Sequence, residues 1–229
     1  MMNKKILLVE DRSDIAELIG FHLEKAGYEV IYAYDGEQAL QVLSIQNIDL
    51  ILLDLMLPKM SGLDVLKSIK LDSLLKGIPV IIESAKGDDA DIIQGLELGA
   101  EDYVTKPFSP KVLLARIKKI FQRNESPDQI QFSFVSSSFS LDAASREVKV
   151  EGKLIELTAI EFDLLTCLVM NKGKVMSREK ILNNVWNDEV LVIDRVVDVH
   201  INSLRKKLRS ASKAIETVRG IGYKFREEG

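Results

Sequence analysis

Long apolar runs, cysteines and histidines are scarce in this chain of 229 residues. No apolar stretch approaches the roughly 20 residues of a membrane-spanning helix, so we expect no membrane partner. The apolar run at residues 6–9 is too short for a secretory signal peptide. Cys167 is the single cysteine, which excludes an internal disulfide framework and suits a reducing cytoplasm. Its apolar surroundings favour a buried hydrophobe over a catalytic thiol.

The net charge of −4 hides a difference between the two halves of the chain. Residues 1–122 carry 14 basic and 19 acidic side chains, whereas residues 123–229 carry 17 and 16. Within the second half, residues 195–226 hold nine basic side chains and two acidic ones. A basic segment on an acidic protein favours a polyanionic partner near the C-terminal end, although a solvated charged face would have the same composition.

Strand and helix patterns alternate five times in the first half of the chain. Apolar runs predict strands at residues 5–9, 29–32, 50–54, 79–82 and 102–105. Between and after them, helical periodicity predicts helices from a cap at Asp14 to Gly27 and at residues 36–43, 63–73, 90–98 and 110–122. This alternation predicts a flavodoxin-like (βα)5 fold, in which a doubly wound parallel sheet is covered on both faces.

A polar segment at residues 123–130, which contains a proline, is expected to be a linker between domains 1–122 and 131–229. After it, the pattern changes to short strands at residues 131–135, 139–141, 147–150 and 154–156. Helices follow at residues 159–171, 178–186 and 194–209, and a β-hairpin spans residues 215–226. This order predicts an α+β winged helix-turn-helix domain.

Charged side chains stand where three of the predicted parallel strands end. Glu10 and Asp11 end the first strand, Asp54 ends the third just before Pro58, and Lys106 follows the fifth. We expect the first strand to lie between the third and the fifth, so that these groups converge at the carboxyl edge of the sheet, where ligands bind. Clustered carboxylates repel one another unless a cation lies among them, and oxygen ligands suit Mg²⁺.

Residues 4–122 resemble a response-regulator receiver domain. The resemblance rests on Glu10-Asp11, on Asp54 with Met56 and Pro58, on Ser84-Ala85, and on Tyr103 ahead of Thr105-Lys106-Pro107-Phe108. It implies that Asp54 is the phosphoacceptor, and that Asp11, Asp54 and the Met56 carbonyl hold Mg²⁺ with help from Glu10. It also implies that Ser84 and Lys106 contact phosphoryl oxygens, that Tyr103 rotates inward as a switch, and that the Lys106–Pro107 bond is cis.

One residue departs from this resemblance beside the expected phosphorylation site. Glu83 stands where the family nearly always has Leu or Met. Its carboxylate would slow phosphorylation if it faced Asp54, or it would be inconsequential if it pointed to solvent. Both readings are open from the sequence.

The OmpR/PhoB subfamily, which this chain resembles, forms a homodimer through the fourth helix, fifth strand and fifth helix of the receiver. Asp102 and Arg116 match a charged pair across that face, and Leu96 matches its apolar centre. A second charged pair is replaced by Ile92 and Val112. We hypothesise that an apolar contact replaces the ion pair, which would make dimerisation less dependent on phosphorylation.

Residues 131–226 resemble the OmpR/PhoB effector domain. The matching segments begin at Leu157-Thr158, Ser177-Arg178, Val185-Trp186, Val197-Asp198, Leu204-Arg205 and Val218-Arg219. Val197, Ile201, Leu204 and Leu208 form one stripe that would bury a recognition helix, whose other side would enter the major groove while Arg219 enters the minor groove. Arg195 could instead cap a helix and His200 could pack. The expected contacts with double-stranded DNA are Trp186, Arg195, His200, Asn202, Ser203, Arg205, Lys206, Thr217, Arg219 and Tyr223.

Together these features predict a cytoplasmic two-component response regulator rather than an enzyme, apart from its own phosphoryl transfer and autodephosphorylation. A histidine kinase would phosphorylate Asp54, and the loop at residues 187–193 would contact RNA polymerase. The alternative is a DNA-binding regulator that dimerises largely without phosphorylation. A phosphotransferase using Asp54 would need a second Asp where Met56 stands, and a dinucleotide-binding enzyme would need a glycine-rich loop after the first strand.

Overall fold

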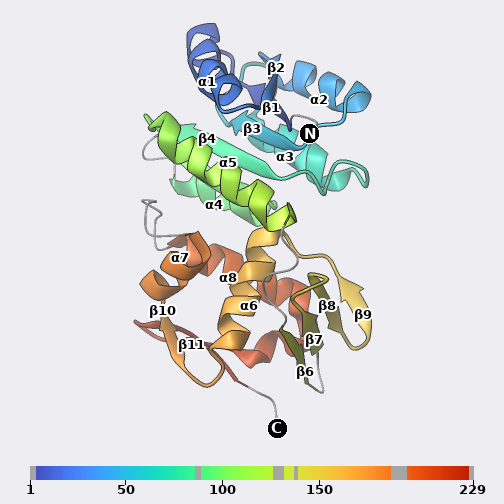
Figure 1. Cartoon of the computed structure of the whole chain (residues 1–229), viewed down its shortest axis with the longest axis vertical. Helices are drawn as coiled ribbons and strands as arrows, with labels where there is room; N and C mark the ends of the chain where they lie inside the picture. The colour runs from blue at the N-terminus through green and yellow to red at the C-terminus, as the bar shows by residue number, and fades with distance from the viewer. Residues whose placement is uncertain (1–3, 86–88, 126–131, 137–138, 187–194, 227–229) are drawn as a thin grey trace. The chain divides into compact units, whose positions relative to one another are not determined.

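The computed structural model describes residues 4–85, 89–125, 132–136, 139–186 and 195–226. The chain divides into two compact units, which meet in sequence between Ile120 and Phe121. Each unit has its own sheet or sheets and its own helices (Figure 1). In the described part of the chain, no helix has the length and apolarity needed to cross a membrane.

The first unit is built on a parallel sheet of five strands in the order β2-β1-β3-β4-β5. The strands are β1 (Lys5–Val9), β2 (Glu29–Ala33), β3 (Leu50–Asp54), β4 (Val80–Ala85) and β5 (Asp102–Lys106). This is the predicted flavodoxin-like fold. The central strand, however, is β3 and not β1 as expected, because β1 pairs with β2 and β3 while β4 and β5 lie beyond β3. Asp54 therefore ends the strand in the middle of the sheet.

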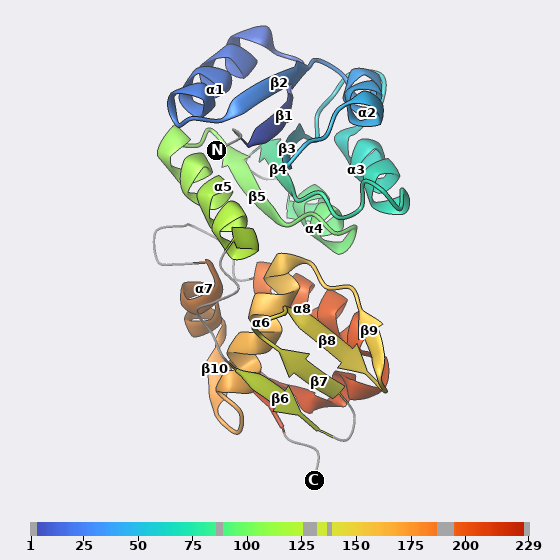
Figure 2. The same ribbon diagram turned by 45° about the vertical axis from the view of Figure 1, so that its right-hand side comes forward.

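Five helices cover the two faces of this sheet, with α1 and α5 on one face and α2, α3 and α4 on the other (Figure 1 and Figure 2). The central strands are apolar on both faces, as expected for a parallel sheet that is covered by helices on each side. Residues 6–9 of β1 and 50–53 of β3 are all apolar and have no exposed surface. The helices are α1 (Ser13–Lys25), α2 (Gly36–Ile45), α3 (Gly62–Leu71), α4 (Asp89–Glu97) and α5 (Pro110–Glu125).

Two helices of the first unit have side-chain caps that the sequence analysis did not name, and the one cap that it predicted, at α1, is wrong. Asp35 and Ser61 accept hydrogen bonds from backbone N–H groups in the first turns of α2 and α3. Asp14 was expected to cap α1, but the capping position is Arg12, and the Asp14 carboxylate pairs with the Arg12 guanidinium at 2.8 Å. The Lys106–Pro107 peptide bond is cis, as the resemblance implied.

The last helix of the first unit is longer than predicted. It was expected to end at residue 122, but α5 continues through Glu125, so the polar segment 123–130 begins as helix. Polarity and the proline at position 127 ended the predicted helix too early, because the helical conformation is disfavoured most directly at the residue just before a proline and the helix can continue up to that point. The remainder of that segment lies outside the described residues.

The second unit begins with an antiparallel sheet in the order β6-β7-β8-β9. Its three main helices follow, and the chain closes with a hairpin of β11 and β12, as predicted for a winged helix-turn-helix domain. The elements are β6 (Ser133–Val135), β7 (Phe139–Asp142), β8 (Glu147–Val150), β9 (Lys153–Ile155), α6 (Ala159–Met170), α7 (Arg178–Trp186), α8 (Arg195–Leu208), the 3₁₀ helix η2 (Arg209–Ala214), β11 (Ile215–Val218) and β12 (Gly222–Phe225).

One strand of the second unit was missed by the sequence analysis. Strand β10 (Val175–Ser177) pairs with β12, which completes a three-stranded sheet in the order β10-β12-β11. A strand of three residues is too short to show an alternation of polar and apolar side chains, and its partner β12 lies far along the chain. A strand whose existence depends on a distant partner gives little local signal.

A glycine at the start of α3 allows the backbone after Asp54 to fold tightly. The Gly62 N–H donates to the Leu55 carbonyl at 3.0 Å, and a Cβ atom on Gly62 would lie 2.2 Å from the Asp54 carbonyl oxygen and 2.6 Å from the Leu55 Cα. Both neighbours are backbone atoms, so neither can rotate out of the way. The loop that follows Asp54 therefore depends on the absence of a side chain at this position.

We predict that Gly62→Ala destabilises the chain by about 1–3 kcal/mol, because the added methyl group must displace the backbone around Asp54. Urea unfolding followed by far-UV circular dichroism measures this loss. Gly77→Ala is the matched control, since a Cβ there meets no atom within 4 Å. Equal unfolding midpoints for the two variants would show that the loop tolerates the methyl group.

Candidate phosphorylation site and DNA-binding surface

Three carboxylates converge at the carboxyl edge of the parallel sheet. One oxygen of each of Glu10, Asp11 and Asp54 lies within 4.8 Å of the others. Glu10 and Asp54 are buried and Asp11 is exposed. These residues come from the ends of the neighbouring strands β1 and β3, so the strand pairing itself brings them together. The sequence prediction placed the same three residues at this edge.

The ammonium group of Lys106 lies among these carboxylates. It donates hydrogen bonds to Glu10 and to Asp54, and it lies 3.4 Å from the Glu83 carboxylate. Burial alone would lower the pKa of Lys106, but the carboxylates of Glu83, Asp54 and Glu10 outweigh burial and raise that pKa well above its usual value. Lys106 is therefore a fixed positive charge at the site.

Glu83 does not point to solvent, which excludes one of the two readings left open by the sequence. Its side chain is completely buried, and its residue pairs in register with Asp54 on the adjacent strand. Burial raises the pKa of the Glu83 carboxyl to about 7, with Lys106 opposing the shift and Glu10 and Asp54 adding to it. Burial likewise raises the pKa of Glu10, although Lys106 opposes the shift. The site thus brings four acidic side chains close to one lysine.

The chemistry of these side chains fits a hard divalent cation. Carboxylate oxygens are the ligands that Mg²⁺ prefers, and a cation would relieve the repulsion among these negative charges. The loop after Asp54 is folded back on it, since the Met56 N–H donates to Asp54 Oδ1 at 2.8 Å. The Met56 side chain is exposed, so only the backbone of Met56 belongs to the site.

The two predicted switch residues lie on neighbouring strands of the same sheet. Ser84 is buried on β4, and its hydroxyl donates a long hydrogen bond of 3.4 Å to the Ala85 carbonyl. A bond of that length is weak, so the hydroxyl is available to a new acceptor. Tyr103 is buried on β5, and the Arg116 guanidinium lies 5.8 Å from the centre of its ring.

The residues predicted for the dimer face are mostly buried within the single chain. Arg116 donates to Asp102 of the same chain, so this expected pair between protomers exists here inside one protomer. Ile92 and Leu96 are 2% and 1% exposed, and Val112 is half-buried. Pairing through Ile92 and Leu96 would require both side chains to become exposed first.

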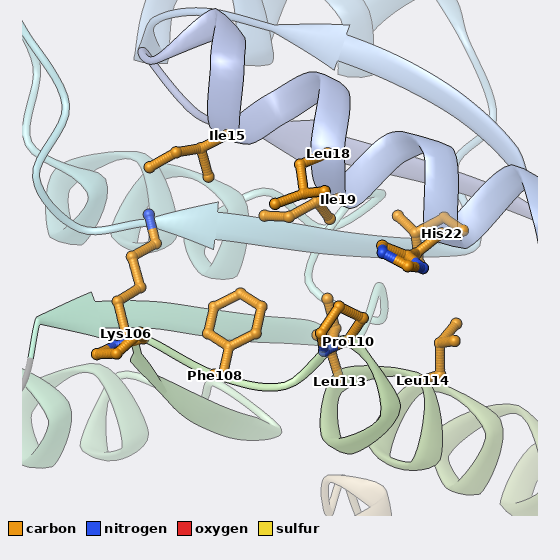
Figure 3. Close-up of a pocket in the computed structure, with 11 residues that line it drawn as sticks. Ile15, Leu18, Ile19, His22, Lys106, Phe108, Pro110, Leu113 and Leu114 are labelled. Atoms are coloured by element: carbon orange, nitrogen blue, oxygen red, sulfur yellow. The ribbon is translucent and has the colours of Figure 1, made fainter.

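An apolar cavity of about 390 Å³ lies between α1 and the start of α5. Figure 3 shows Ile15, Leu18 and Ile19 of α1 on one side and Phe108 and the first turns of α5 on the other. The Lys106 side chain lines one end of the cavity. The cavity therefore lies beside the acidic cluster and belongs entirely to the first unit.

The expected DNA-reading surface of α8 is only partly available. Asn202 and Lys206 are exposed, as predicted. The Ser203 hydroxyl instead donates to Glu161 at 2.7 Å, and Lys207 donates to the other oxygen of the same carboxylate at 2.6 Å. Glu161 also completes the capping box with Thr158 at the start of α6. Ser203 thus joins α8 to α6, which the sequence analysis did not foresee.

The hairpin presents two of the predicted residues to solvent. Thr217 and Arg219 are exposed, and Arg219 lies next to the tip of the β11–β12 hairpin. Arg205 of α8 reaches the hairpin, donating to the Ile215 carbonyl at 2.7 Å and to the Thr217 hydroxyl at 2.9 Å. These bonds fix the hairpin relative to α8, so the two elements that were predicted to contact DNA are held together.

Three residues that were predicted to contact DNA have buried side chains in the structure. Trp186 and His200 pack ring against ring with centroids 5.6 Å apart. Tyr223 lies between the guanidinium groups of Arg178 and Arg205, and its hydroxyl donates to Asp198 at 2.6 Å. Buried rings offer little surface to DNA, and they serve here to pack the helices and the hairpin.

Two residues of this surface were missed by the sequence analysis. Arg178 at the start of α7 donates to Asp198 of α8 at 2.7 Å, which links the two helices of the helix-turn-helix. Both residues lay in segments that carried the resemblance, but only their contact gives them a role. The Arg195 side chain and the loop at residues 187–193 lie outside the described residues.

Comparison with known proteins matches both units to established families. Residues 6–118 match the response regulator receiver domain, and residues 152–225 match the C-terminal domain of transcriptional regulatory proteins. The chain is 40% identical to the alkaline phosphatase synthesis transcriptional regulatory protein PhoP of Bacillus subtilis, over 99% of this chain and 98% of PhoP. It is 42% identical to the phosphate regulon transcriptional regulatory protein PhoB of Escherichia coli, over 98% of each chain.

A solved structure gives the same result for the fold. The chain resembles the response regulator DrrB, an OmpR/PhoB homologue from Thermotoga maritima, with a TM-score of 0.52 and 34% identity over 98% of this chain and 100% of DrrB. These matches extend over nearly the whole chain, so they include the parallel sheet, the acidic residues at its carboxyl edge and the C-terminal domain. The chain therefore belongs to the OmpR/PhoB family and is a two-component response regulator, in which a receiver domain is followed by a transcription-regulatory C-terminal domain.

Proposed function

We propose that a sensor histidine kinase phosphorylates Asp54 and that this step controls binding of the C-terminal domain to double-stranded DNA. The observation that carries the proposal is the position of Asp54, at the end of the central strand and in contact with Lys106, with Glu10 and Asp11 beside it. A nucleophilic carboxylate next to a fixed positive charge is the arrangement that phosphoryl transfer requires.

In the proposed reaction, an oxygen of Asp54 forms a bond to phosphorus while the nitrogen–phosphorus bond of the kinase phosphohistidine breaks. The imidazole leaves with the electron pair of that bond. Lys106 pairs with a phosphoryl oxygen, and the Ser84 hydroxyl donates to another in place of the Ala85 carbonyl. Asp11, Asp54 and the Met56 carbonyl, with Glu10, would hold Mg²⁺, which supplies further charge neutralisation. Loss of the phosphoryl group to water would be the domain's own slow reaction.

We propose that the kinase docks on the apolar cavity between α1 and α5. The cavity offers aliphatic side chains from α1, and Lys106 at one end connects it to the phosphorylation site. A helical partner that covers this cavity would place its phosphohistidine beside Asp54 and exclude water from the transfer. In this proposal, the first unit provides both the surface on which the kinase docks and the nucleophile, Asp54.

For the C-terminal domain, we propose that α8 enters the major groove and that Arg219 enters the minor groove. Exposed Asn202 and Lys206 face outward on α8, and Arg219 lies at the hairpin. Arg205, through its bonds to the hairpin, sets the spacing between the two elements. A contact of residues 187–193 with RNA polymerase belongs to the same proposal and rests on the family resemblance alone.

We also propose that phosphorylation leads to a homodimer of receiver domains in the cytoplasm. The alternative, a dimer held by Ile92 and Val112 without phosphorylation, receives less support from the present geometry. Ile92 and Leu96 are buried and Arg116 is already paired with Asp102 in the single chain. An association step that must first expose two buried side chains and break an ion pair needs a driving event, and phosphorylation supplies one.

We expect a dimer only when a phosphoryl mimic occupies the site. Analytical ultracentrifugation with and without beryllofluoride plus Mg²⁺ measures this for the wild type and for Asp54→Ala. The wild type should sediment as a monomer alone and as a dimer with the mimic, whereas Asp54→Ala should remain monomeric in both. A dimer in all four samples would contradict the proposal and favour the phosphorylation-independent alternative.

We expect Arg219→Ala to weaken DNA binding by about 1–3 kcal/mol, because a guanidinium in the minor groove is lost. The measurement is fluorescence anisotropy, with a duplex that the wild-type protein has selected from a random library. Lys153→Ala on β9 is the control, since it removes the same charge from a strand outside the proposed surface. Equal affinities for the two variants would argue against a groove contact by Arg219.

A further inference from the structure

Glu83 is a buried carboxylate that the established chemistry of the site does not use. Its side chain has no exposed surface, and within the described part of the chain neither of its oxygens has a hydrogen-bond partner. The Lys106 ammonium lies 3.4 Å from Glu83 Oε2, beyond good hydrogen-bonding distance but well within ion-pair distance. Such a side chain is costly to bury, so its surroundings must interact with it strongly.

Strand register explains why Glu83 faces the phosphorylation site. Glu83 pairs with Asp54 of β3 on one side and with Val104 of β5 on the other. Paired residues of neighbouring parallel strands project their side chains to the same face of the sheet. The pairing of β4 with β3 and β5 therefore fixes the face of the sheet on which the Glu83 side chain lies, and this is the face that carries Asp54.

The acidic side chains around Lys106 outnumber its positive charge. An ammonium group has three donors, and two of them are given to Glu10 and Asp54. Glu83 approaches the same nitrogen from β4. A phosphoryl group on Asp54 needs Lys106 for its own oxygens, and Glu83 lies where it draws the ammonium in another direction.

We infer that Glu83 is a positioning residue that competes with the phosphoryl group for Lys106 and so weakens the phosphorylated state of the receiver. The inference rests on the proposed phosphorylation of Asp54. Because Glu83 is buried, its pull on Lys106 is not screened by solvent ions as that of a surface charge would be. Removing the carboxylate should leave Lys106 free to pair with the phosphoryl oxygens.

The test is the affinity of the full-length protein for beryllofluoride in the presence of Mg²⁺, measured by isothermal titration calorimetry. Glu83→Gln keeps the size of the side chain and removes its charge, and Glu83→Leu provides a second, apolar replacement. We expect both to bind the mimic roughly tenfold more tightly than the wild type, since one competing charge at ion-pair distance is removed. Far-UV circular dichroism of each variant verifies that it is folded.

A matched control separates the local effect from a change in net charge. Glu29→Gln removes one negative charge at the start of β2, at the edge of the sheet opposite the strand ends that carry the site. It should bind the mimic as the wild type does. If the Glu83 variants bind no more tightly than Glu29→Gln, or bind more weakly, the inference is wrong and Glu83 supports the site instead.

A second background tests whether the effect passes through Lys106. In Lys106→Met, the substitution Glu83→Gln should give little or no gain in affinity, because the contested cation is absent. A full tenfold gain in that background would overturn the proposed route and indicate direct repulsion between Glu83 and the mimic. Asp54→Ala tests the proposed function separately: binding equal to the wild type would contradict phosphorylation at Asp54, and with it the inference.

Discussion

The ammonium group of Lys106 is the interaction on which the receiver site depends. It joins the end of β5 to Glu10 on β1 and to Asp54 on β3, and it lies within ion-pair distance of Glu83 on β4. Without this cation, buried carboxylates from three strands would face one another and repel with no positive charge between them. A single positive charge therefore holds together the carboxylates at the carboxyl edge of the sheet.

The position of this site could be predicted because a parallel sheet brings the ends of its strands to one edge. Glu10, Asp11, Asp54 and Lys106 stand at the ends of predicted strands, so the cluster was predicted correctly even though the expected strand order was wrong. The environment of Glu83 was harder to predict, since it depends on the register of β4 against β3. A shift of one residue would turn its side chain to the other face. Sequence patterns locate a strand but leave its register open.

In the C-terminal domain, the sequence pattern likewise located a helix but did not show which of its side chains are buried. The apolar stripe of α8 was predicted correctly, but it is wider than four residues: Val196 and His200 are buried beside Val197 and Ile201. An apolar face on a globular helix commonly spans more than 100°, and His200 falls within that width. Trp186 and Tyr223 were expected at DNA because the family resemblance gave them that role. Their burial depends on contacts between α7, α8 and the hairpin that no local pattern records.

Charged pairs at both ends of β5 restrict how the receiver can change its state. Asp102 begins this strand and is tied to Arg116 of α5, while Lys106 ends it and is tied to β1 and β3. Tyr103, between them in sequence, is buried beneath the Arg116 guanidinium. In the proposed function, phosphorylation of Asp54 would act on the ion pairs that Lys106 forms with Glu10 and Asp54. For a dimer to use Arg116 and Asp102 between protomers, this second pair must also exchange partners. The inferred competition of Glu83 for Lys106 therefore acts at the carboxyl end of β5, whereas the Asp102–Arg116 pair lies at the start of the same strand.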